Sequence, residues 1–416
     1  MLHHGGRKNL LAWGVLLVSG GLISFPAVRC YSAEIDEINA AIQATGAKWI
    51  AKENPVSMLP PEERRKRLGA MEELDTGAAA GESPSGAVTL PSAFDWRNYN
   101  GNDFVTPVRN QGNCGSCWAF STTAALESKT LITYGWSDSD LNLSEQIVVS
   151  CTDTLAPSGD ARPNNCESGG YASTASDFLK YTGTNLETCY TYTATDGACS
   201  SACSSWQSNV FKFTSWSSVV SGGTATASAL KNAIYASGPV VAWFKVYDDF
   251  YSYHSGVYSY TSGSYLGNHF VLVVGWDDSQ SAFIVKNSWD TYWGESGYFR
   301  ISYAELAGTT QFGRWTYGYP GNVIAPTVYV AQNGQCGGKT PCFTTIQSAI
   351  NSAKTHTMIN ITQETYNENV VLNGAKVLSG QGGWDSAFTN CLSWATIHGS
   401  LTIRGGTLHA DGVILK

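Results

Sequence analysis

The longest apolar stretch of the chain lies close to its N-terminus. Two basic residues precede an uncharged run from Asn9 to Val28 that is rich in Leu and Val. A basic start, an apolar middle and small residues near Ala27 and Ala33 are typical of a secretory signal, so residues 1–33 are predicted to direct export. A retained membrane anchor is the alternative, because neither candidate cleavage site has a small residue three positions upstream.

The next segment, residues 34–89, is charged and contains no cysteine. Isoleucines at positions 35, 38 and 42 recur at helical spacing. A second short helix is expected between Pro60 and Gly69, because its acidic residues come first and its basic residues last, which suits the helix dipole. Residues 77–86, rich in Gly and Ala, follow as an exposed linker. A short helical segment before a linker is typical of a small domain, a spacer or a removable prosegment.

Apolar runs of strand length dominate residues 90–322, together with one clear helix from Trp118 to about Lys129. Two of the runs, HFVLVVGW and AFIVK, are separated by a polar turn and predict a β-hairpin. Folding this hairpin about Asp278 brings His269 opposite Asn287, within side-chain reach. The mixture of patterns predicts an α+β domain.

After Pro326 the chain changes to short apolar runs broken by Gly and Asn. Such runs suggest the start of a parallel β-helix, so residues 326–416 are predicted to form a separate all-β unit. Its last apolar run, residues 412–415, has no polar cap after it, and an open coil exposes unpaired backbone groups. This unit is therefore expected to pack on the preceding domain or to self-associate, a truncated sequence being the third possibility.

Composition narrows the class of protein. Charged residues make up only 14% of the chain and the net charge is −8, so nothing electrostatic favours a nucleic-acid partner. Eleven cysteines are more than idle cytosolic thiols would explain, and they favour an oxidising compartment. A secreted, extracellular or periplasmic location is expected.

The sequence QGNCGSCWAF, residues 111–120, carries the densest chemical signal. Cys117 falls at the N-terminus of the predicted helix, where the dipole favours a thiolate and lowers the pKa of the thiol. A Cys-x-x-Cys pair is otherwise typical of a redox motif or of half a zinc site. Zinc would need a second Cys pair or a His pair at ligand spacing, which the sequence lacks, and the flanking pattern is not the βαβ unit of a thioredoxin-like motif. No metal and no cofactor are expected.

These motifs together resemble the papain/cathepsin family of cysteine peptidases. The family signature Cys-Gly-Ser-Cys-Trp is present, and His269 and Asn287 follow Cys117 by 152 and 170 residues. Further matching segments are LPSAFDWR, LNLSEQIVVSC, CESGGY and KNSWDTYWGESGYFRI. The resemblance covers residues 90–319 and implies a two-lobed α+β fold, with a helical lobe and a β-barrel-like lobe.

The resemblance also implies a role for each catalytic residue. Cys117 would be the nucleophile, His269 the general acid and base, and Asn287 the residue that orients the imidazole. Gln111 and the Cys117 backbone N–H would form the oxyanion hole. Trp289 would shield the Asn–His pair from solvent.

Substrate contacts follow from the same comparison. Gly169 and Gly170 lack side chains, which would let an extended substrate backbone approach. Trp243 aligns with the side of the specificity pocket and would narrow it. Phe270 stands where the family usually has a small residue, and Asp290 where it usually has Gly, although Asp tolerates a left-handed conformation.

The remaining cysteines fit a disulfide framework. The resemblance pairs Cys114 with Cys166 and Cys151 with Cys199, which leaves Cys117 free. Cys189 and Cys203 lie in one Gly/Ser-rich stretch and are expected to form a third bridge. Cys336 and Cys342 enclose five residues and are candidates for a fourth.

The sequence therefore predicts a secreted cysteine endopeptidase, made as a zymogen, that acts on proteins or peptides. Residues 34–89 are similar to the short prosegments of cathepsin B-like enzymes, which would lie across the cleft; a solvated spacer is the alternative. Residues 90–322 would form the peptidase domain, and residues 326–416 resemble the opening of pectate-lyase-like surface proteins, a right-handed parallel β-helix.

Two other classes of function compete with this interpretation. A catalytically dead binding protein is disfavoured by the intact Cys117, His269, Asn287 and Gln111. A surface adhesin or polysaccharide-binding protein with an accessory peptidase would make the C-terminal unit the main functional part.

Overall fold

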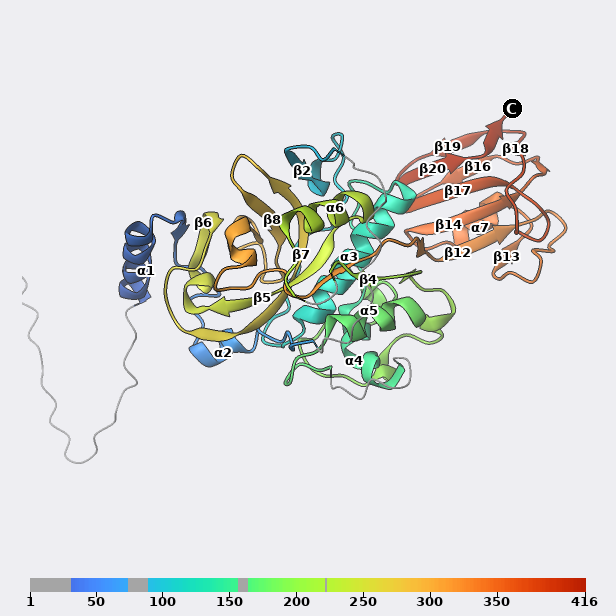
Figure 1. Ribbon diagram of the computed structural model, residues 1–416. Coiled ribbons are helices and arrows are strands. Elements are labelled where there is room, and N and C mark those ends of the chain that lie inside the picture. The colour runs from blue at the N-terminus through green and yellow to red at the C-terminus, as the bar shows by residue number, and fades with distance from the viewer. Residues whose placement is uncertain (1–30, 74–88, 156–163, 221–222) are drawn as a thin grey trace, which may run out of the picture.

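The computed structural model describes residues 31–73, 89–155, 164–220 and 223–416 (Figure 1). Almost all of the predicted secretory signal and the whole predicted linker lie outside these residues. We call residues 31–73 the N-terminal segment, residues 89–325 the central domain and residues 326–416 the C-terminal module. In the described part of the chain, no helix has the length and apolar character needed to cross a membrane.

The helical lobe of the central domain is built around α3 (Cys117–Tyr134). This helix is buried over most of its surface, because small and apolar side chains cover almost its whole circumference. It ends one turn later than its sequence pattern predicts, at Gly135, whose φ of 67° provides the left-handed C-cap. The helices α4 (Glu145–Leu155) and α5 (Ala172–Tyr181) pack against it.

The second lobe is a nine-stranded sheet with strand order β1-β6-β9-β8-β7-β5-β10-β4, in which β2 also pairs with β7. Its edge strand β1 (Lys48–Ala51) comes from the N-terminal segment. The central strands are strongly apolar, and α3 packs against β7, so the two lobes share one hydrophobic core. The strands of the central domain that matter here are β2 (Ala93–Asp95), β4 (Ser217–Ser218), β5 (Val240–Tyr247), β6 (Tyr253–Tyr258), β7 (Tyr265–Asp277), β8 (Ala282–Lys286), β9 (Tyr298–Ser302) and β10 (Thr316–Gly318).

The predicted β7–β8 hairpin is present, but its predicted register is wrong. Asp277 pairs with Ala282, and Leu272 pairs with Lys286 after an irregularity near Gly275. The turn is therefore centred beyond Asp278, near Ser279 and Gln280, and this displaces the whole ladder from the predicted register. The irregularity near Gly275 changes the pairing by only one residue and in the opposite direction. His269 lies three residues past the last pair of this ladder and is opposite Phe244 of β5 instead.

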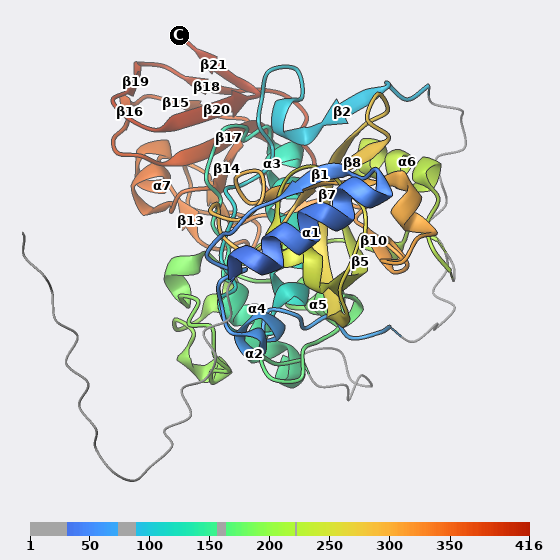
Figure 2. The same ribbon diagram turned by 90° about the vertical axis from the view of Figure 1, so that its left-hand side faces the viewer.

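The N-terminal segment lies against the central domain, as Figure 2 shows. It contains α1 (Tyr31–Thr45), β1 (Lys48–Ala51) and α2 (Pro61–Arg65), in agreement with the two helices predicted from the sequence. The strand β1 pairs antiparallel with β6 and so extends the central sheet. Trp49 is buried and packs on Tyr258, with ring centroids 5.2 Å apart.

The C-terminal module consists of short strands that pair in parallel, in three separate sheets. Its buried Val, Ile and Leu side chains form a hydrophobic core of their own. The strands and the helix of the module are β12 (Thr327–Val330), β13 (Cys342–Phe343), α7 (Ile346–Ser352), β14 (Thr357–Thr362), β15 (Thr365–Tyr366), β16 (Val370–Leu372), β17 (Val377–Trp384), β18 (Ala395–Ile397), β19 (Leu401–Ile403), β20 (Thr407–Asp411) and β21 (Val413–Leu415).

The module packs against the central domain just beyond the C-terminal end of α3. The indole nitrogen of Trp136 donates a 2.6 Å hydrogen bond to Ser379 Oγ, and its ring packs edge-on against His356. His356 Nε2 lies 3.1 Å from Ser139 Oγ. Since Cys117 is at the opposite end of α3, the module is attached far from that residue (Figure 1).

Four disulfides are present in the described residues. Three join the pairs expected for the central domain, and the fourth closes the short loop of the C-terminal module. The pairs are Cys114–Cys166, Cys151–Cys199, Cys189–Cys203 and Cys336–Cys342. Cys117 and Cys391 are free, the first buried and the second exposed.

Candidate active site

The structure brings Cys117, His269 and Asn287 to the junction of the two lobes. Cys117 is the first residue of α3, His269 lies on β7, and Asn287 directly follows β8. His269 Nε2 and Asn287 Oδ1 are 2.8 Å apart, so the predicted contact exists although the predicted register does not. His269 Nδ1 is buried and has no hydrogen-bond partner among the described residues, which leaves this nitrogen available for a proton.

An indole covers the His–Asn pair. The Trp289 ring lies 4.9 Å from the imidazole, centroid to centroid, and stacks on Tyr251 on its other side. Trp289 is almost fully buried. A hydrogen bond shielded in this way from water is stronger than an exposed one, and the placement of Trp289 matches its predicted shielding position.

The Cys117 thiol does not have the lowered pKa that its helix position suggested. Burial raises the pKa of Cys117 to about 11, and the backbone N–H groups of Phe270, Gly69 and Trp118 oppose this only in part. Burial also lowers the pKa of His269 to about 4, although the hydrogen bond of its ring with Asn287 opposes this shift. In this state the thiol and the imidazole are both neutral at pH 7. The expectation failed because it considered the helix dipole without the burial of the thiol, against which Gly69 of the N-terminal segment packs.

That covering segment approaches the predicted oxyanion site. Gln111 is fully buried, and its Nε2 donates to the carbonyl oxygens of Arg67, at 3.0 Å, and of Cys114, at 2.9 Å. Its Oε1 accepts a 2.6 Å hydrogen bond from Ser288 Oγ, which fixes the orientation of the amide. A carbonyl of the N-terminal segment therefore occupies the donor that was predicted to bind the oxyanion.

The same segment pairs with the predicted substrate-binding glycines. Gly170 N donates to Gly69 O at 2.8 Å, and Met71 N donates to Gly170 O at 3.0 Å, so Ala70 and Gly170 form a parallel bridge. A Cβ added at Gly169 would lie 2.3 Å from the carbonyl oxygen of Gly69. Glycine is therefore needed at this position for the backbones to approach.

Trp243 and Asp290 were both singled out in the sequence, and the structure bears on them differently. Trp243 is fully buried, with its ring edge-on to Trp315 at 4.6 Å, so it has no exposed surface while the N-terminal segment is in place. Contact of Trp243 with substrate stays a prediction. Asp290 has a φ of 71°, the left-handed conformation expected where the family usually has glycine.

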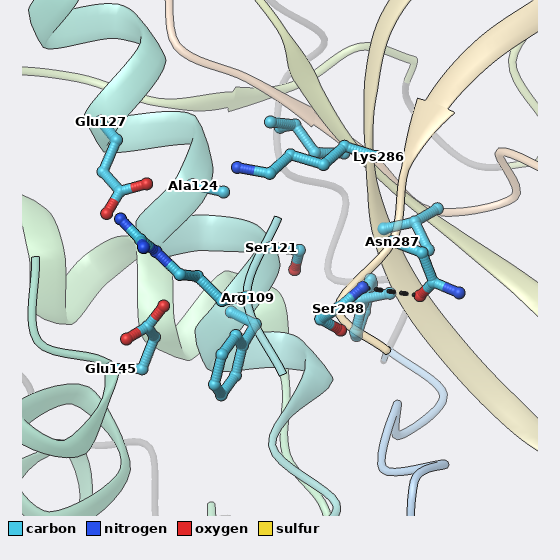
Figure 3. Close-up of a pocket in the computed structure, with 12 residues that line it drawn as sticks. Arg109, Ser121, Ala124, Glu127, Glu145, Lys286, Asn287 and Ser288 are labelled. Atoms are coloured by element: carbon cyan, nitrogen blue, oxygen red, sulfur yellow. Dashed lines mark hydrogen bonds between the residues drawn. The ribbon is translucent and has the colours of Figure 1, made fainter. Parts of the chain in front are cut away.

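Behind the His–Asn pair lies a buried group of charges that the sequence analysis missed. Figure 3 shows Lys286 of β8 directed toward α3, where Glu127 lies close to the Arg109 guanidinium. Thr106 Oγ1 donates to Glu127 Oε2 at 2.5 Å and accepts from Lys286 Nζ at 3.0 Å. The cavity between these residues is small, about 20 Å³. Phe270 and Asn287 also line the cavity, so the group lies between the two lobes next to the His–Asn pair.

The sequence analysis also missed Ser116 and Tyr192, which lie beside Cys117. Ser116 Oγ is 2.6 Å from Tyr192 Oη, although the residues are 76 positions apart. No local pattern reveals such a contact. Glu127 did have a signal, since it is the one acidic residue of α3 and the ten residues of the helix before it are small or apolar. Among the described residues, no group of three or more His, Cys, Asp or Glu side chains is arranged to hold a metal ion.

Comparisons with known proteins agree with this geometry. Residues 90–312 match the family described as "Papain family cysteine protease". A "Cathepsin L-like proteinase" of Fasciola hepatica is 40% identical over 216 residues, which are 51% of this chain and 60% of that protein. A "Cathepsin B-like CP2" of Giardia intestinalis is 36% identical over 234 residues, covering 54% of this chain and 74% of that protein.

Solved structures extend the likeness to the N-terminal segment. A procathepsin L 3 from the larval midgut of Tenebrio molitor superposes with a TM-score of 0.54 and 26% identity, covering 69% of this chain and 88% of that one. A procathepsin B from Trypanosoma congolense superposes with a TM-score of 0.57 over 71% of this chain and 97% of that one; at 23% identity this shows the shared fold. Since the family match covers more than half of the chain, the chain belongs to the papain family of cysteine proteases.

Proposed function

We propose that the chain is the precursor of a secreted cysteine endopeptidase that cleaves proteins or peptides through Cys117, His269 and Asn287. The observation that carries the proposal is the buried 2.8 Å contact of His269 with Asn287, which leaves Nδ1 without a partner among the described residues. The backbone N–H of Phe270, the next residue, acts on the sulfur of Cys117 at the N-terminus of α3. That arrangement suits a base whose second nitrogen is held by an orienting group. The relatives named as cathepsins and cysteine proteinases support the same reaction class.

The reaction follows from the groups in place. His269 Nδ1 takes the proton of the Cys117 thiol, and the sulfur attacks the scissile carbonyl carbon. The carbonyl oxygen becomes negative and is stabilised by Gln111 Nε2 and the Cys117 backbone N–H. His269 then protonates the leaving amine, and the C–N bond breaks to give a thioester. Water hydrolyses the thioester, with His269 as the base, and restores the thiol.

The N-terminal segment acts as an inhibitory prosegment in this proposal. Its Arg67 carbonyl binds Gln111 Nε2, and its Gly69 and Met71 backbone groups use both hydrogen-bonding positions of Gly170. A substrate would need the same groups. Ala70 and Gly170 pair in parallel, so the N-terminal segment runs in the same direction as the backbone at Gly170. Cleavage in the linker that joins the segment to the central domain would activate the enzyme.

Substrate preference and location complete the proposal. An apolar or aromatic residue is expected two positions before the scissile bond, with Arg disfavoured, because Trp243 would add an aromatic wall once the segment leaves. Four disulfides suit an oxidising compartment and hence secretion. The parallel strands of the C-terminal module support a fragment of a parallel β-helix, which we propose mediates surface attachment or self-association.

The test is peptide hydrolysis by the activated chain with and without its nucleophile. Cys117→Ala is expected to abolish hydrolysis and leave the unfolding temperature nearly unchanged. Cys391→Ala is the matched control, because Cys391 is the other free thiol in the described part of the chain and lies on the surface of the module. Hydrolysis that survives Cys117→Ala would overturn the proposal.

A further inference from the structure

The hydroxyl of Tyr192 joins the two ends of the loop that precedes the nucleophile. Tyr192 Oη donates a 2.8 Å hydrogen bond to the carbonyl oxygen of Gln111 and lies 2.6 Å from Ser116 Oγ. A phenol has a single proton, and here it is directed to Gln111, so Ser116 must donate to Tyr192. Gln111 is the proposed oxyanion donor, and Ser116 is the residue directly before Cys117.

Tyr192 is itself held on three sides. Its backbone N–H donates a 2.6 Å hydrogen bond to Glu187 Oε1, and its ring packs edge-on against Phe120 of α3 at 4.7 Å. The Cys189–Cys203 disulfide lies just before it in the chain, and Cys199 is bonded to Cys151 of α4. Burial raises the pKa of Tyr192, so the hydroxyl stays neutral and keeps its proton for Gln111.

The bond to Tyr192 also removes Ser116 from a competing role. Ser116 occupies the N-cap position of α3, where a serine oxygen usually accepts a hydrogen bond from the first backbone N–H groups of the helix. Here Ser116 makes no such bond. The N–H groups of Cys117 and Trp118 act on the Cys117 sulfur instead, where they lower the pKa of the thiol. By binding the Ser116 hydroxyl, Tyr192 thus leaves the N–H groups of Cys117 and Trp118 available to the sulfur.

We propose that Tyr192 is a positioning residue for the oxyanion hole: its hydroxyl fixes the loop from Gln111 to Ser116, so that Gln111 Nε2 and the Cys117 N–H point at one oxygen. This inference rests on the proposed peptidase function. Removing a direct oxyanion donor costs roughly 100- to 1000-fold in kcat, so loosening two donors that remain present should cost less, about tenfold. The loss should fall on kcat, because the loop contacts the charge that develops on the substrate oxygen.

Two reagents separate oxyanion positioning from an effect on the thiolate. Addition of Cys117 to a peptide aldehyde forms a C–S bond and breaks the carbonyl π bond, and with the thiol proton held on His269 Nδ1 the former carbonyl oxygen is left negative in the hole, so aldehyde affinity reports on the loop. Displacement of iodide from iodoacetamide also consumes the thiolate but places no charge on a carbonyl oxygen. Iodoacetamide therefore reports on the thiolate alone.

The experiment compares the activated chain, which keeps the central domain and the C-terminal module, with its Tyr192→Phe variant. This variant loses only the hydroxyl. We expect kcat and aldehyde affinity to fall about tenfold while KM and the iodoacetamide rate stay within about twofold. Tyr190→Phe is the matched control from the same segment, because its hydroxyl lies beside Gly197. Unchanged kcat and aldehyde affinity in Tyr192→Phe would overturn the proposal, and so would an equal fall of the iodoacetamide rate.

A second variant keeps the proposal testable if Tyr192→Phe fails to fold. Ser116→Ala removes the other hydroxyl of the pair and should lower kcat and aldehyde affinity in the same pattern, and unchanged values would overturn the proposal. Where Tyr192→Phe does fold, combining it with Ser116→Ala should give no further loss. Fully additive losses would contradict a shared role. A wild-type chain that cleaves no peptide would defeat the proposed function, whereas its aldehyde affinity would still decide the role of Tyr192.

Discussion

The backbone amide of Gly170 donates a 2.8 Å hydrogen bond to the carbonyl oxygen of Gly69, across the groove beside Cys117. The contact is so close that a Cβ placed on Gly69 would lie 1.8 Å from the carbonyl oxygen of Gly115. Backbone thus packs directly on backbone at the point where the N-terminal segment covers the thiol. In the proposed inhibition, docking of this segment would depend on the absence of a side chain at Gly69.

Gly69→Ala should therefore weaken inhibition in the uncleaved chain. Overpacking of this kind costs about 1–3 kcal/mol, which corresponds to a roughly 5- to 150-fold weaker docking of the segment. The check is peptide hydrolysis by the full-length precursor before any cleavage. Gly46→Asn is the control, since Gly46 has open space around it and a φ of 70° that Asn tolerates. If the Gly69→Ala precursor hydrolysed peptide no faster than the wild-type precursor, this mechanism of inhibition would be contradicted.

A second anchor of the N-terminal segment is Trp49 on β1. Its ring is buried against Tyr253 and Tyr258 of β6. Trp49→Ala should cost about 3 kcal/mol of docking energy and raise the activity of the precursor. Ile50→Ala is the matched control, because Ile50 is the next residue on the strand and is 50% exposed. Equal effects of the two substitutions would show that β1 does not dock as the structure has it.

The attachment of the C-terminal module can be tested at Trp136 and Ser379. Trp136→Phe keeps a ring against His356 but removes the N–H that donates to Ser379 Oγ at 2.6 Å. In a double-mutant cycle with Ser379→Ala, the coupling energy should be about 1 kcal/mol. It is measured from the thermal unfolding of the module in the full-length chain. Peptidase activity should not change, since the contact is at the far end of α3 from Cys117. Strictly additive effects would argue that this hydrogen bond does not stabilise the interface.

The sequence predicts the proximity of the candidate groups best where these groups are contiguous in the chain. The segment from Gln111 to Cys117 places an amide, a tight loop and a thiol within seven positions, so its interpretation needed no tertiary information. The contact of His269 with Asn287 was also predicted correctly, yet for the wrong register. The turn is centred near Ser279 and Gln280 instead of Asp278, which displaces the ladder, and nothing in the polar run from Asp277 to Gln280 marks the centre of the turn.

The remaining features depend on segments that meet only in the folded chain. The pKa of Cys117 was predicted to be low, and it is raised because the thiol is fully buried, in a place where Gly69, about 50 residues upstream, packs against it. Tyr192 contacts Ser116, which precedes it by 76 residues, through its hydroxyl. A sequence pattern does not distinguish this hydroxyl from that of any other tyrosine. Local patterns specify helices and strands, whereas these contacts are set by tertiary packing.

The central claim is that the N-terminal segment silences a nucleophile that is otherwise ready to react, and the pH dependence of Cys117 alkylation tests it. A thiol with a pKa of about 11 is ionised to only about one part in a thousand at pH 8, and its thiolate fraction grows about tenfold per pH unit up to that pKa.

The measurement is the iodoacetamide rate at Cys117, determined by mass spectrometry from pH 6 to 10, in the precursor and in the chain freed of its N-terminal segment. Exposed Cys391 is the internal reference in both. We expect a slow, steadily rising rate in the precursor, and a rate at least about a hundredfold higher at pH 7 once the helix N-terminus and His269 act on an uncovered thiol. Identical rates at Cys117 in the two forms would contradict the account.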